Sequence, residues 1–148
     1  MEKKNFRDCF SQDEYWMGIA FFLAAKSSSK QMMIAVDDEG RLVCVAQEDF
    51  VRSSQYEHNF PLEVDIIANC KNLPICVIYS TFTPCYSMIS NLVCAKLRRL
   101  VFYKTKDLGR DSQDLINCNR SLILTQFTGN LNWMRDYMSI LESSGIFT

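Results

Sequence analysis

The spacing of apolar and polar residues predicts a helix followed by a hairpin in the first third of the chain. Residues 11–27 open on the sequence SQDE, which is typical of a capping box, and continue with apolar residues at helical spacing. Two short runs rich in Val, Ile and Met, at 31–36 and 41–46, flank the turn sequence DDEG. These runs predict two antiparallel strands.

The middle of the chain predicts a strand, a helix and a second strand. The apolar run at 75–79 is typical of a strand buried on both faces, and 100–103 is a similar run. Between them, Thr83 is a candidate N-cap and Pro84 suits the first turn of a helix that reaches about Lys96. Such a short connection implies a parallel, right-handed crossover.

The remaining segments complete an α/β order. We expect a short helix over 61–71, a helical turn near 112–118, a strand at 121–127 and a last helix over 131–143. Residues 47–60 have no period and are interpreted as a loop. The order predicts a three-layer α-β-α sandwich with a five-stranded mixed sheet and flanking helices.

Composition favours one ordinary globular domain over residues 1–148, with the first ten residues frayed. The net charge of -1 gives no overall basic excess for nucleic acid. The seven cysteines are odd in number and mostly lie in apolar runs, so we expect reduced thiols and an intracellular location, cytoplasmic or nuclear. The longest apolar run, residues 18–25, is too short to span a membrane.

Two motifs carry a resemblance to a known family. Residues 61–67 (PLEVDII) and 83–88 (TPCYSM) lie where cytidine and deoxycytidylate deaminases have their two zinc-site motifs, and 13–20 and 34–43 are similar to the first helix and hairpin of that family. The chain resembles this family well over roughly residues 10–105. The resemblance implies the cytidine deaminase-like fold and a site at the two motifs.

In that family, one His or Cys from the first motif and two Cys from the second hold zinc, and a glutamate moves protons. The resemblance places Glu63 at the proton-shuttle position and Cys85 at one ligand position. The other two ligand positions hold Pro61, which has no donor, and Met88, whose thioether is a poor zinc ligand. Because catalytic zinc needs three protein ligands, we predict a lost zinc site, no cofactor and no enzyme activity.

The resulting hypothesis is a catalytically inactive, deaminase-like domain that acts through protein–protein interaction, as a scaffold in a homo- or hetero-oligomer. Glu63 would then be a relic or would pair with a neighbouring group, and Cys85 would be a small residue on a buried helix face. Trp133 and Tyr137 lie in a segment rich in residue types that are common at interfaces. They are the candidate contact surface.

A rearranged zinc site is the first alternative. His58, the only histidine, lies three residues before Pro61 and would join Cys70 and Cys85 as a ligand. This alternative predicts bound zinc and turnover of a cytidine nucleotide, whereas a surface histidine is the simpler interpretation.

A metal-free nucleotide- or RNA-binding module is the second alternative. It would use a cluster of basic residues, which is otherwise interpreted as a solvated rim: Lys96, Arg98, Arg99, Lys104 and Lys106. Glu48 and Asp49, which lie where the family contacts the nucleotide, would repel a phosphate. The sequence therefore leaves a nucleic-acid partner open.

Overall fold

A five-stranded mixed sheet forms the centre of the computed structural model, which describes residues 12–26, 31–47, 62–70, 72–119 and 121–132. The spatial order of its strands is β2-β1-β3-β4-β5. The two β1 pairings are antiparallel, whereas β3–β4 and β4–β5 are parallel. The strands are β1 (Met32–Val36), β2 (Leu42–Gln47), β3 (Val77–Ser80), β4 (Arg99–Phe102) and β5 (Ile123–Gln126). The predicted hairpin, crossover and mixed sheet are confirmed.

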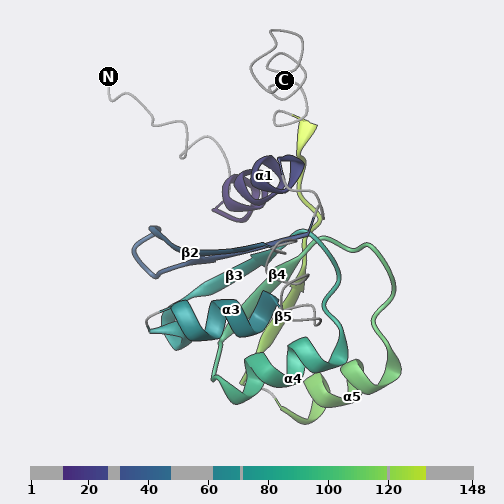
Figure 1. The fold of residues 1–148 in the computed structure, drawn as a ribbon. Helices are drawn as coiled ribbons and strands as arrows, with labels where there is room; N and C mark the ends of the chain where they lie inside the picture. The colour runs from purple at the N-terminus through teal and green to yellow at the C-terminus, as the bar shows by residue number, and fades with distance from the viewer. Residues whose placement is uncertain (1–11, 27–30, 48–61, 71, 120, 133–148) are drawn as a thin grey trace, which may run out of the picture.

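Helices cover both faces of this sheet, as Figure 1 shows. The helices are α1 (Gln12–Ala25), α3 (Leu62–Asn69), α4 (Tyr86–Cys94) and α5 (Arg110–Cys118). Helix α1 lies on one face, and the other three lie on the opposite face (Figure 1). This arrangement confirms the predicted three-layer α/β sandwich. Among the described residues, no helix is long and apolar enough to cross a membrane.

The interior strand β1 contributes to two separate cores. All five of its residues are buried. Met33 and Ala35 face the core under α3 and α4, whereas Met32, Ile34 and Val36 face the core under α1. Because successive side chains of a strand point to opposite faces, a strand that is apolar throughout requires a helical layer on each side.

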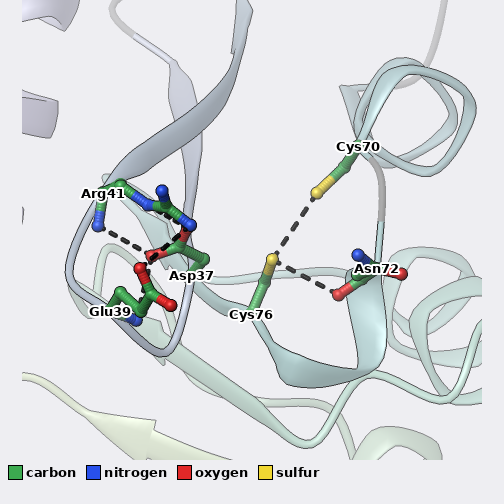
Figure 2. Close-up of polar contacts among 6 residues, drawn as sticks. All are labelled: Asp37, Glu39, Arg41, Cys70, Asn72 and Cys76. Carbon is green, nitrogen blue, oxygen red and sulfur yellow. Dashed lines mark hydrogen bonds and ion pairs between the residues drawn. The ribbon is translucent and has the colours of Figure 1, made fainter.

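The turn between β1 and β2 is fixed by Asp37. Its Oδ1 accepts hydrogen bonds from the backbone N–H of Arg41 at 2.8 Å and of Glu39 at 3.0 Å. The Arg41 side chain also reaches Asp37 Oδ2 at 2.9 Å (Figure 2). The backbone N–H of Arg41, aided by these other donors, lowers the pKa of Asp37. Gly40 has φ 76°, a conformation in which glycine costs least.

Several predicted boundaries are wrong by a few residues. The strand predicted at 75–79 begins at Val77, because Ile75 belongs to a short 3-10 helix, η2 (Leu73–Ile75). The next helix begins at Tyr86 with Cys85, not Thr83, as its N-cap. Strands β4 and β5 and helix α5 fall within a few residues of the prediction. The predicted loop begins one residue too early, because Gln47 ends β2. The rest of that loop and all but the start of the last helix lie outside the described residues.

A polar network on the α1 side ties α1 to the sheet. Arg99 donates to both carboxylate oxygens of Asp13, at 2.9 and 2.6 Å, and the Tyr79 hydroxyl donates to Asp13 Oδ1 at 2.9 Å. Burial by itself raises the pKa of Asp13, but the bonds from Arg99 and Tyr79 outweigh it, and the net pKa lies below 3.8. The carboxylate therefore joins the first turn of α1 to β3 and β4.

We predict that Asp13→Asn lowers the free energy of unfolding by about 2 kcal/mol at pH 7, because it removes charge-assisted bonds from a half-buried network. Since the folded pKa is depressed, this stabilisation is complete above the unfolded pKa near 3.8 and is lost as the pH falls through the folded pKa. Urea denaturation at pH 7 and below pH 3 measures both effects.

Asp107→Asn is the matched control, because Asp107 pairs with Lys104 in an exposed ion pair. Such pairs contribute little, so the control should change stability less than Asp13→Asn does. Equal losses in the two variants would contradict a structural role for the Asp13 network.

Candidate functional site

The segment after β3 is held by Thr83. Its buried hydroxyl accepts the backbone N–H of Thr105 at 2.9 Å and of Lys106 at 3.2 Å, and donates to the carbonyl of Lys106 at 2.9 Å. In return, the backbone N–H of Thr83 donates to the Thr105 hydroxyl at 3.1 Å. Thr83 therefore joins the segments that follow β3 and β4, and it fixes the position from which Pro84 and Cys85 enter α4.

Cys85 is exposed at the N-terminus of α4, with its Sγ 3.3 Å from the Ser87 hydroxyl oxygen. The expectation of a buried Cys85 is wrong, because the residue caps the helix and precedes its first buried turn. Met88 is partly buried and packs against the core under α3 and α4.

An open pocket of about 380 Å³ lies beside Cys85. Tyr86 and Cys85 form one part of its wall, and the start of α5 with the segment before it forms another. Both signs of charge line it, through Lys106, Asp107, Arg110 and Asp111. The pocket therefore carries both signs of charge among apolar side chains, at the end of the sheet where the strands β3 and β4 finish.

Glu63 is the buried acid of the candidate site. It lies in the first turn of α3 and only 2% of the residue is exposed. Its Oε1 accepts a hydrogen bond from the Asn91 side-chain amide on α4 at 3.2 Å, and its Oε2 is buried without a hydrogen-bond partner among the described residues. A buried carboxyl oxygen without a partner is costly. It therefore marks a place where a polar group from a ligand would be stabilised.

The described residues do not fit zinc. They contain no group of three or more His, Cys, Asp or Glu side chains arranged to hold a metal ion. Of the ligand positions that the resemblance implies, Cys85 provides a thiol and Met88 a thioether, while Pro61 lies outside the described residues.

Cys70, which the first alternative assigns to a rearranged zinc site, lies against another cysteine. Its sulfur contacts that of Cys76 at 3.7 Å (Figure 2), and burial raises the pKa of its thiol to about 12. The structure therefore places the sulfur of Cys70 against Cys76, and His58 lies outside the described residues.

The five residues of the basic cluster are divided between the two ends of β4. Lys96 and Arg98 precede the strand, and Arg99 is its first residue and binds Asp13. Lys104 and Lys106 follow the strand, and Lys104 pairs with Asp107 at 2.9 Å. The candidate contact residues Trp133 and Tyr137 lie outside the described residues.

Comparison with solved structures identifies the fold. A tRNA:A34 deaminase structure matches with a TM-score of 0.61 at 17% identity, over 79% of this chain and 100% of the other. The dCMP deaminase of cyanophage S-TIM5 matches with a TM-score of 0.61 at 12% identity, over 78% and 96% of the two chains. The guanine deaminase of Nitrosomonas europaea matches with a TM-score of 0.60 at 13% identity, over 84% and 83%.

The chain has the cytidine deaminase-like fold. At these identities the likeness shows the fold of this deaminase-like domain, not its substrate. Comparisons with protein-family models and with curated proteins find no match.

Two predictions made from the sequence are corrected by this comparison. The prediction that the chain is not an enzyme is contradicted, because the structures that share its fold are deaminases and nothing in the described residues shows a loss of activity. The prediction of no cofactor is contradicted as well, because it conflicts with the zinc chemistry of the deaminase family. The presence of Pro61 and Met88 at two of the implied ligand positions therefore establishes neither a lack of enzyme activity nor a lack of a cofactor.

The residues that the sequence did not reveal are those that connect elements. Asn91, the partner of Glu63, lies 28 positions away, and Thr105, a partner of Thr83, lies 22 positions away. No local motif marks either partner, because each is brought into contact only by the packing of two elements. The helical spacing of the first motif did indicate that Glu63 lies near the start of a helix.

We predict that Thr83→Val lowers the free energy of unfolding by about 2 kcal/mol, because it removes the buried hydroxyl that binds the backbone of Thr105 and Lys106. Thr83→Ser retains the hydroxyl and is the matched control. Thermal and urea denaturation of the three proteins provide the measurement, and equal stability of the Val and Ser variants would contradict this role.

Proposed function

We propose that this deaminase-like domain is an enzyme that replaces the exocyclic amino group of a nucleobase with oxygen. The observation that carries the proposal is the buried Glu63 carboxyl, which has one oxygen held by Asn91 and the other without a partner among the described residues. The fold supports the proposal, because the similar structures are deaminases of tRNA adenosine, dCMP and guanine.

The residues suit proton transfer. In such a reaction, water adds to the ring carbon that bears the amino group, and ammonia leaves. Glu63 would accept one proton of the attacking water on Oε2 and pass it to the ring nitrogen. It would then take the proton of the newly formed hydroxyl group and pass it to the amine, so that the C–N bond breaks, ammonia leaves and a carbonyl remains. Asn91, by donating to Oε1, would hold the carboxyl in one orientation.

The described residues supply few side chains that could bind a catalytic zinc. The described residues contribute one thiol, Cys85, to the ligand positions that the resemblance implies, and a catalytic zinc requires three protein ligands. Further ligands would have to come from outside the described residues, where His58 lies.

We predict that Glu63→Gln lowers the rate of deamination by about 10²–10⁴-fold, because the amide cannot accept and return a proton. Ammonia release from cytosine, adenine and guanine nucleosides and nucleotides measures the rate, with and without added zinc. Gln preserves the size of the side chain and can still contact Asn91, so the melting temperature should change little.

Asp65→Asn is the matched control, since Asp65 is a second acid in the same helix and is less buried than Glu63. It should leave the rate near that of the natural protein. Absence of turnover across the whole substrate panel, or equal rates for Glu63→Gln and Asp65→Asn, would contradict the proposed reaction.

We propose in addition that the domain associates with another protein chain through strand β2. This strand lies at the edge of the sheet, and three of its apolar residues are exposed: Leu42 (44%), Val43 (38%) and Val45 (43%). Exposed apolar edge strands are prone to pair with other chains. Trp133 and Tyr137 stay predicted members of a contact surface.

We predict that Val45→Lys weakens this association, because a charge on the exposed edge opposes both pairing and burial. Sedimentation velocity over a range of protein concentrations measures the effect. Ile123→Lys is the matched control, because Ile123 is 60% exposed on β5, the opposite edge strand. A natural chain that stays monomeric at every concentration would contradict self-association and restrict the proposal to a different partner.

A further inference from the structure

Two cysteines meet in the connection between α3 and β3. Cys70 follows the last residue of α3, and its backbone N–H still donates to the carbonyl of Ile66 at 2.9 Å. Cys76 immediately precedes β3. Figure 2 shows their side chains pointing toward one another, with the sulfurs 3.7 Å apart.

The contact between the two thiols is ordered by its surroundings. The Cys76 thiol donates to the backbone carbonyl of Asn72 at 3.5 Å. Asn72 has φ 57°, a left-handed conformation that reverses the chain between the helix and η2. Both cysteines belong to the core under α3 and α4. The fold therefore holds the two sulfurs together over a separation of only six residues.

We propose that Cys70 and Cys76 are a redox-sensitive pair that forms a reversible disulfide between α3 and β3. A disulfide has an S–S length of about 2.05 Å, so the sulfurs need to approach by about 1.6 Å. Rotation of the two side chains, accompanied by adjustment of the short connection, supplies that movement. The cross-link can form whatever reaction the domain catalyses.

Hydrogen peroxide is the oxidant that we assign to this step. The sulfur of one cysteine attacks a peroxide oxygen, the O–O bond breaks, and a sulfenic acid and one water form. The second sulfur then displaces the hydroxyl group as water, and the S–S bond forms. Two thiols are oxidised and one peroxide is reduced.

Burial makes this pair slow to react near neutral pH. Burial raises the pKa of Cys70 to about 12 and also raises that of Cys76, and only the thiolate is a strong nucleophile. The rate of cross-linking should therefore rise about tenfold for each pH unit between pH 7 and 9. A third thiol, Cys44, packs against the same core and is the competing partner.

The cross-link would restrain α3 relative to β3. Cys70 directly follows the helix that carries Glu63, and Cys76 directly precedes the strand that leads to Thr83 and Cys85. A disulfide at this point would join α3 and β3, the two elements that position the candidate site. It would lie at the C-terminal end of α3 and the N-terminal end of β3, away from Glu63 and Thr83.

Peptide mapping of the full chain tests the proposal without any substitution. The reduced protein is treated with hydrogen peroxide at pH 8, alkylated and digested with trypsin without reductant. Cleavage after Lys71 separates the cysteines into the peptides 53–71 and 72–96. We expect these peptides joined, with fragmentation placing the bond at Cys76 rather than at Cys85 or Cys94, and separated again by dithiothreitol.

Variants and stability provide the controls. Cys76→Ala should abolish the joined peptides, whereas Cys94→Ala, at an exposed position, should leave them unchanged. The oxidised natural chain should melt about 5 °C above the reduced one, because the cross-link restricts the unfolded chain. Recovery of Cys70 and Cys76 alkylated while exposed cysteines oxidise, or a bond from Cys70 to Cys44, would overturn the proposal.

Discussion

Double-sided burial of the central sheet is the constraint on which the rest of this structure depends. Strand β1 is apolar at all five positions and lies between β2 and β3, so it has no face that water could cover. Helix α1 is needed on one side and α3 with α4 on the other. Because α3 and α4 must both pack against the same face, the buried Glu63 comes within reach of Asn91. The candidate site is thus a consequence of how this face is covered.

Several buried or half-buried polar groups of the described residues join elements that are distant in sequence. Asp13 binds Arg99 across 86 positions, and Thr83 binds the backbone at Thr105 and Lys106. Both sets of bonds replace the water that these groups lose on burial. The partly unpartnered carboxyl of Glu63 stands apart from this pattern, which is why it carries the functional proposal.

The two sulfur sites differ in character. Cys85 is exposed at a helix N-terminus beside an open pocket. Cys70 and Cys76 are buried as a pair in a short connection, and burial keeps their thiols protonated. Cys85 is therefore an accessible thiol at the candidate site. Cys70 and Cys76 are a separate, buried pair in the connection between α3 and β3.

The sequence by itself determined the order of elements, the hairpin and the mixed sheet, because apolar period and turn residues act over a few neighbouring positions. It also placed Glu63 at a helix start. It mistook the exposed Cys85 for a buried residue, since a cap position is decided by where the first turn forms. Only the tertiary structure decided the contacts of Glu63 with Asn91 and of Asp13 with Arg99. Those contacts depend on which helix packs on which face of the sheet, and no local pattern encodes that choice.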